Sequence, residues 1–173
     1  MPNRNDRKLG LTGIRDEPGL GFSTFGFGIF FGFRISCLGF ASGSAVGRLV
    51  KTINVIGCGN VGKALSRLWT RHGVFRVQSV LNRSVESGAR AVEFVGAGRA
   101  VDDYARLEPA DLVMISASDE AIEMCCRRLC AAGSLAEGAI VFHTSGSLPS
   151  SLLKPVRSRG ALVASVHPVK SFA

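Results

Sequence analysis

The sequence predicts an α/β protein built on a doubly wound, mostly parallel β-sheet. From residue 50 onward, apolar runs typical of strands alternate with amphipathic runs typical of helices. The strand runs are continuously apolar, as expected of strands that are covered on both faces of a parallel sheet. A glycine-rich stretch separates the first strand from the first helix. These three observations predict one domain over residues 50–173 with about five or six strands.

The elements follow one another in a regular order. Strands are expected over residues 51–57, 75–82, 99–103, 110–117, 138–146 and 161–168. Helices are expected over residues 60–73, 84–96 and 118–133, and residues 147–160 are expected to form a helix or a helical turn. Gly73 is expected to end the first helix. Ser118 is the expected N-cap of the third, and the acids that follow it favour a helix start.

Residues 1–49 differ from this pattern and hold seven of the eleven phenylalanines of the chain among many glycines. Three interpretations are open. The segment could be a secretory signal, a membrane helix interrupted by Arg34, or an extension outside the functional fold. We prefer the third interpretation, with a poorly structured extension, because a complete strand–helix pattern begins directly after it.

Composition argues against several classes of function. The formal net charge is +8, but the basic residues form no stripe interleaved with aromatic residues, so a nucleic-acid partner is not expected. The five cysteines are odd in number, form no CxxC pair and have no histidine at metal-ligand spacing. We therefore expect no metal site, no membrane attachment and a reducing, cytoplasmic location.

The stretch "INVIGCGNVGKAL" places Gly57, Gly59 and Gly62 at the spacing G-x-G-x-x-G between a strand and a helix. In such a unit the first glycine allows a tight turn, the second lets a pyrophosphate approach the backbone, and the third lets helix and strand pack closely. The free N–H groups of the helix then face the phosphates. The sequence predicts dinucleotide contacts along this loop, from Gly57 through Cys58, Gly59, Asn60 and Val61 to Gly62. The alternative is a glycine-rich turn that binds nothing. The Cys58 thiol is expected to be inert.

The second strand ends in "LNRS" and carries no carboxylate where an NAD-preferring site would have one. Asn82 and Ser84 can hydrogen-bond there, and Arg83 would favour a 2′-phosphate, so the sequence predicts NADP(H). The alternative is that Arg83 is an ordinary solvated side chain. The small residues Ser116 and Ala117, after the fourth strand, are expected to leave room for the cofactor.

Polar side chains also follow the fifth and sixth strands. His143 and Ser145 come from "FHTSGS", and His167 and Lys170 come from "SVHPVKSFA". Histidine serves as an acid or base near neutral pH, so His143 and His167 are the candidate catalytic residues. Ser145 and Lys170 are the candidate substrate-binding groups.

The motifs "INVIGCGNVGKAL", "LNRS", "ISASDEAI", "VFHTSGSL" and "SVHPVKSFA", in this order, resemble the N-terminal half of the Rossmann-like, DUF2520-containing proteins. That family comprises proposed NADP-dependent oxidoreductases related to pyrroline-5-carboxylate reductase and to the 6-phosphogluconate dehydrogenase-like group. The resemblance covers about residues 51–173 and implies NADP(H) at the glycine loop and at residues 82–84. It implies no settled substrate. The "HP" after the sixth strand also resembles prephenate dehydrogenases.

Two departures from the family pattern matter. Ser118 stands where the family often has proline, and family members continue into a C-terminal helical domain that completes the substrate pocket and usually the dimer. We therefore expect a fragment or one half of a split gene. The homodimer is expected to form through the C-terminal domain that this sequence lacks. The expected function is hydride transfer on a small carbonyl, imine or hydroxyl substrate. The alternatives are a non-catalytic dinucleotide-binding module or sensor, a prephenate-dehydrogenase-like fragment and, from residues 19–45 alone, a secreted or membrane-attached protein.

Overall fold

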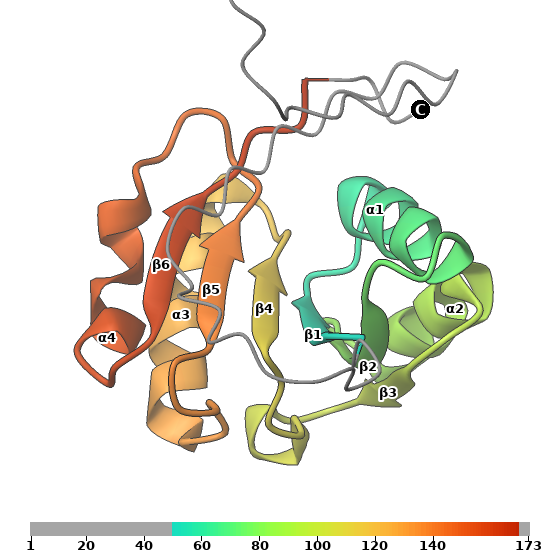
Figure 1. Ribbon diagram of the computed structural model, residues 1–173, viewed down its shortest axis with the longest axis horizontal. Helices are drawn as coiled ribbons and strands as arrows, with labels where there is room; N and C mark the ends of the chain where they lie inside the picture. Colours follow the sequence, from blue (N-terminus) through green and yellow to red (C-terminus); the bar gives the residue numbers. More distant parts are fainter. Residues whose placement is uncertain (1–49, 170–173) are drawn as a thin grey trace, which may run out of the picture. The chain divides into compact units, whose positions relative to one another are not determined.

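A computed structural model describes residues 50–169 of the chain. The predicted extension over residues 1–49 and the candidate Lys170 lie outside the described residues. Six strands form one sheet in the order β3-β2-β1-β4-β5-β6, and every neighbouring pair is parallel (Figure 1). The strands are β1 Thr52–Ile56, β2 Arg76–Leu81, β3 Arg99–Val101, β4 Leu112–Ile115, β5 Ile140–His143 and β6 Leu162–Ser165. The predicted doubly wound fold is confirmed.

Helices cover both faces of the sheet. They are α1 Asn60–Arg71, α2 Val85–Val95, α3 Asp119–Ala132 and α4 Lys154–Arg157, with short 3-10 turns at Tyr104–Arg106 and Ser150–Leu153. Helices α1 and α2 lie side by side on one face, and α3 and α4 lie on the other (Figure 1). The segment predicted as a helix or helical turn before β6 is therefore a 3-10 turn that runs into the single turn of α4. Between residues 50 and 169, no helix is long and apolar enough to cross a membrane.

Each strand sends alternate side chains to the two faces, so the sheet separates two apolar cores. Ile56, Val113 and Val141 belong to the core under α3 and α4. Val55 and Phe142 belong to the core under α1 and α2. Because successive side chains of a strand point to opposite faces, continuously apolar strands are what two covered faces require.

The strand β1 carries one buried polar side chain, Asn54, which is 1% exposed. Its Nδ2 donates to the carbonyl of Glu108 at 2.7 Å, and its Oδ1 accepts from the N–H of Ser79 in β2 at 3.1 Å. The pairing of β1 with β2 is irregular between Ile53 and Val55, so the side chain bonds a backbone group where the ladder is interrupted. Asn54 thereby fixes β1 between its neighbours.

The two serine N-caps differ in their contacts. Ser84 is the N-cap of α2, and its side chain accepts from the N–H of Ser87. Ser118 is the N-cap of α3, as predicted, but its side chain makes no capping hydrogen bond. The first turn of α3 is instead favoured by Asp119 and Glu120, whose negative charges interact well with the helix dipole.

Candidate functional site

A pocket of about 610 Å³ opens at the carboxyl edge of β1, β2 and β4. From β1 the chain adds β2 and β3 on one side of the sheet and then β4 on the other side of β1. Open α/β sheets bind ligands at such a point, where the strand order changes direction. Of the residues predicted to bind a cofactor, the pocket is lined by Gly57, Cys58, Gly59, Asn82, Arg83, Ser116 and Ala117. The others, Asn60, Val61, Gly62 and Ser84, stand beside it at the starts of α1 and α2.

Two of the three glycines are required by the fold itself. Gly57 has a φ of +76°, and a Cβ built on it would lie 2.7 Å from the backbone of Ala117. A Cβ on Gly62 would lie 2.5 Å from the Oγ of Ser116. That hydroxyl donates to the carbonyl of Gly57 at 2.8 Å, so the turn, α1 and β4 are held together at this point. A side chain at either glycine would separate them.

Gly59 differs from both, because a Cβ built on it would meet no atom within 4 Å. Its φ is −79°, so its backbone does not need glycine either. Gly59 is the N-cap of α1, which begins at Asn60, and the first N–H groups of a helix have no partner within that helix. The open space beside Gly59 therefore faces a helix N-terminus, which favours an anion.

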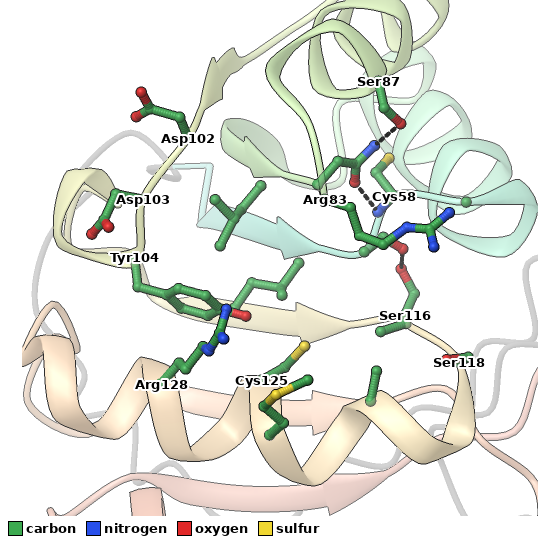
Figure 2. Close-up of a pocket in the computed structure, with 18 of the residues that line it drawn as sticks. Cys58, Arg83, Ser87, Asp102, Asp103, Tyr104, Ser116, Ser118, Cys125 and Arg128 are labelled. Carbon is green, nitrogen blue, oxygen red and sulfur yellow. Dashed lines mark hydrogen bonds between the residues drawn. The ribbon is translucent and has the colours of Figure 1, made fainter.

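Asn82 joins the glycine loop to the end of β2. Its Oδ1 accepts from the N–H of Cys58 at 2.6 Å, and its Nδ2 donates to the Oγ of Ser87 at 3.0 Å. Figure 2 shows both bonds at one end of the pocket. Both polar atoms of the Asn82 amide are engaged within the protein, so Asn82 positions the glycine loop. Arg83, the next residue, lines the pocket and can contact a ligand.

Three cations line the pocket: Lys63, Arg83 and Arg128. Within residues 50–169, none of the three forms an ion pair; the ion pairs there join Lys51, Arg99, Arg106 and Arg127 to acids. Asp102 and Asp103 also line the pocket. Asp102 pairs with Arg106, and Asp103 accepts from the N–H of Ala105. Among the described residues, three cations outside any ion pair face one such acid, Asp103, so the unpaired charge of the pocket is positive on balance.

The end of the pocket away from the glycine loop was not predicted. Tyr104 follows β3, and α3 contributes Ala121, Met124, Cys125 and Arg128. These four α3 residues share one helix face, since they are spaced i, i+3, i+4 and i+7. The spacing was present in the sequence. Only the structure shows that this face borders the pocket, whereas Ile122, Cys126 and Leu129 face the core.

Cys58 is 1% exposed, and burial raises the pKa of its thiol to about 11. The thiol is therefore protonated at neutral pH, although it stands near a helix N-terminus. We expect Cys58 to resist iodoacetamide at pH 7 in the folded protein and to react once the protein is denatured. Mass spectrometry of the alkylated peptides measures this, and rapid labelling of the folded protein at Cys58 would contradict it.

The predicted catalytic His143 is fully buried at the end of β5. Its Nε2 lies 3.3 Å from the carbonyl of Pro149, and its Nδ1 has no partner among the described residues. The chain places the imidazole on the side of the sheet that α3 and α4 cover, since Val141 belongs to that core. His143 does not line the pocket described above.

Ser145 is 7% exposed, and its hydroxyl is engaged inside its own loop. The Oγ accepts from the N–H groups of Ser147 and Leu148 at 3.2 and 3.3 Å. The Ser147 hydroxyl in turn donates to Asp119 at 2.6 Å, and this bond lowers the pKa of the Asp119 carboxyl. Ser145 thus holds its own loop, and Ser147 links that loop to the start of α3.

His167 is exposed beyond β6 and contacts the loop after β5. A Cβ built on Gly146 would overlap the imidazole of His167, so the imidazole packs directly on the Gly146 backbone. The structure therefore brings His167 next to the loop that holds Ser145, but it does not bring His167 to the pocket. Among the described residues no group of histidines, cysteines and acids could hold a metal ion.

Fold and site together define a doubly wound α/β domain with a glycine-rich turn from a strand to an anion-favouring helix N-terminus. The chain belongs to the Rossmann-like domain family, whose model matches residues 41–168. Among curated protein sequences, none matches this chain significantly.

Solved structures share this fold. A Bacteroides fragilis protein provisionally assigned as an NADP oxidoreductase is 25% identical, with a TM-score of 0.60 over 71% of this chain and 45% of that one. Prephenate dehydrogenase from A. aeolicus is 21% identical, with a TM-score of 0.58 over 72% of this chain and 43% of that one. (S)-3-hydroxybutyryl-CoA dehydrogenase from Ralstonia eutropha is 17% identical, with a TM-score of 0.54 over 68% and 49%. The chain spans less than half the length of each of these proteins.

Proposed function

We propose that the described domain binds NADP(H) and serves an oxidoreductase that acts on a small carbonyl, imine or hydroxyl substrate. The observation that carries this proposal is the open space at Gly59. A glycine that neither its φ nor its protein neighbours require, at a helix N-terminus, fits a pyrophosphate that approaches the backbone. When bound, the nicotinamide would give or take the hydride, and the protein would bind and orient both reactants.

The names of the structural neighbours support a nicotinamide dinucleotide. The B. fragilis protein is described as an NADP oxidoreductase, and the A. aeolicus structure contains NAD⁺. The choice of the phosphorylated form rests on this chain's own residues. Arg83 lines the pocket directly after β2, and no carboxylate stands at the end of that strand to favour a free ribose hydroxyl.

Arg83→Asp is expected to weaken NADPH binding by tenfold to a hundredfold, roughly the effect of losing a charge-assisted contact of 1.5–3 kcal/mol. NADH binding is expected to change little, since NADH has no 2′-phosphate. Titration followed by nicotinamide fluorescence measures both affinities. Arg90→Asp is the matched control, because Arg90 is exposed on α2 and does not line the pocket. Unchanged NADPH affinity in Arg83→Asp would mean that Arg83 is only a solvated side chain.

The proposed substrate side is formed by residues that follow β5 and β6. His167 is the exposed histidine at the rim, by which we mean the loops after β5 and β6, and it can exchange a proton with a substrate there. His143 is buried and bonded to Pro149, so it would act by holding the loop of Ser145 or by polarising a group that reaches it. Lys170 is proposed to bind a substrate carboxylate, and a homodimer through a further C-terminal domain is proposed to complete the pocket.

The competing function is a dinucleotide-binding module or sensor without turnover. It is favoured by the engaged hydroxyl of Ser145 and the burial of His143, which leave few free polar groups at the rim. A prephenate-dehydrogenase-like reaction is the second alternative and rests on the fold shared with the A. aeolicus enzyme. Steady NADPH oxidation with small carbonyl compounds would support the oxidoreductase. Tight NADPH binding without turnover, also in a chain extended at its C-terminus, would support the module.

The location and the partners are also proposals. We propose a cytoplasmic protein that takes a small-molecule substrate and binds neither nucleic acid nor membrane. Cys58, Cys125, Cys126 and Cys130 are free thiols, which a reducing compartment preserves.

A further inference from the structure

The pocket has two ends with different chemistry. At one end stand the glycine loop, Asn82 and Arg83, where Figure 2 shows Arg83 beside Cys58 and Ser116. At the other end Figure 2 shows Arg128 beside Tyr104 and Cys125. The first end has the helix N-terminus that favours phosphate. The second end lies beyond β3 and against the middle of α3.

The second end combines apolar and flat groups with two acids, Asp102 and Asp103, which Figure 2 shows on the Tyr104 side. Tyr104 is half-buried and packs on the core under α3, as Cys125 does. Met124 is 51% exposed, a large apolar side chain left open at the pocket wall. Ala121 completes the apolar strip on the same face of α3. A hydrophobic wall of this kind suits an aromatic ring better than a phosphate.

Arg128 lies next to this wall and carries a positive charge that no acid of the described residues pairs with. It lies one helical turn beyond Met124 and Cys125 on the same face of α3. Within residues 50–169 it makes no ion pair, whereas the adjacent Arg127 pairs with Glu123 at 2.7 Å. A guanidinium that is unpaired, planar and next to an apolar wall is well suited to stack on an aromatic ring.

We propose that Arg128 recognises the purine base of the dinucleotide, with its guanidinium stacked on the adenine against the wall formed by Tyr104, Met124 and Cys125. This inference rests on the proposed function. In doubly wound domains the adenosine ribose lies at the end of the second strand, which here is followed by Arg83. With the pyrophosphate at Gly59, the base then extends from Arg83 toward the Tyr104 end of the pocket. The 2′-phosphate then meets Arg83, and the base reaches Arg128. The two arginines thus read different parts of one ligand.

The test compares two variants against two ligands. Arg128→Ala is expected to weaken NADPH and NADH binding by the same factor, about tenfold, because both ligands carry the same base. Arg83→Ala is expected to weaken NADPH alone. Arg128→Lys is expected to stay weakened, since an ammonium group lacks the flat face that stacks. Fluorescence titration of each variant gives the affinities.

Arg127→Ala is the matched control, because Arg127 is the neighbouring arginine of α3 and does not line the pocket. Thermal unfolding checks that each variant keeps the stability of the parent protein, which is expected because Arg128 is exposed. Equal losses for both ligands in Arg128→Ala, absent from Arg127→Ala, would support the proposal.

Four results would overturn it. A loss for NADPH alone would mean that Arg128 binds the 2′-phosphate, and full recovery in Arg128→Lys would mean that only its charge matters. Unchanged affinities in Arg128→Ala would mean that the base lies elsewhere, while the proposed function would stand. If the parent protein binds neither ligand, the proposed function fails, and the role of Arg128 fails with it.

Discussion

Gly59→Asp is expected to abolish dinucleotide binding while the domain stays folded. A carboxylate at this position would enter the space proposed for the pyrophosphate, about 4 Å from its charge, where repulsion is on the order of 4 kcal/mol at an effective dielectric constant near 20. That energy corresponds to a loss of more than about a hundredfold in affinity. Fluorescence titration with NADPH measures the binding, and circular dichroism with thermal unfolding reports the fold.

Gly59→Ala separates the two causes of that loss. Because a Cβ at Gly59 meets no protein atom within 4 Å, alanine is expected to leave the unfolding temperature nearly unchanged. It is still expected to weaken NADPH, since the methyl group occupies part of the space next to the phosphates. If both variants bind NADPH as the parent protein does, the glycine loop does not hold the dinucleotide, and the proposed function is wrong.

Gly57→Ala is expected to destabilise the domain by about 3 kcal/mol. An L-residue in the left-handed region costs roughly 1–2 kcal/mol. The φ of Gly57 is +76°, and its new Cβ would in addition lie 2.7 Å from the backbone of Ala117, which cannot move as a flexible side chain would. Overpacking of this kind adds about 1–3 kcal/mol. Urea unfolding measures the free energy of unfolding.

Gly59→Ala serves again as the comparison, since it makes the same chemical change two residues away in the same loop. We expect Gly57→Ala to lose much of the stability and Gly59→Ala to lose almost none. The direct effect on NADPH affinity is expected to be larger for Gly59→Ala than for Gly57→Ala. Equal stabilities for the two variants would show that β4 and the glycine loop do not pack as closely as the structure has them.

Hydrogen bonds hold the loop after β5, where the substrate side of the site is proposed, in one shape. Ser165 donates to the carbonyls of Ser145 and Leu148 at 3.3 Å, and Ser147 donates to Asp119. These bonds tie the loop after β5 to both β6 and α3. A substrate that approaches the rim would therefore meet a loop with a fixed shape, and His167 packed on Gly146 is the exposed titratable group beside it.

Much of the molecule could be predicted from the order of its residues. The alternation of apolar runs and amphipathic runs gave the class of fold, because a strand that is apolar throughout can only be stable with both faces covered. The spacing of Gly57, Gly59 and Gly62 located the turn from β1 to α1, since the reasons for each glycine are local to a strand–turn–helix unit. The lack of a carboxylate in "LNRS" is also local, as that strand end directly adjoins the loop.

Other features depended on which elements pack against each other. The sequence could not show that Arg128 and Tyr104 share a pocket with Arg83. Tyr104 follows β3 and Arg128 lies on α3, both far along the chain from the glycine loop, and only the packing of α3 against the sheet brings them to one pocket. Nor could it show that one face of α3 borders the pocket while the next faces the core. A helical pattern shows which residues share a face of the helix, but not which other element that face contacts.

The strand ends show the same division. The sequence by itself determined that His143 and Ser145 stand at the carboxyl edge of the sheet, because every strand of a parallel sheet ends there. The tertiary structure alone decided that His143 is buried against Pro149 and that the hydroxyl of Ser145 holds its own loop. The physical reason is that a buried polar group must find a partner, and whether that partner is a ligand or a neighbouring backbone group depends on how the next segment folds over it.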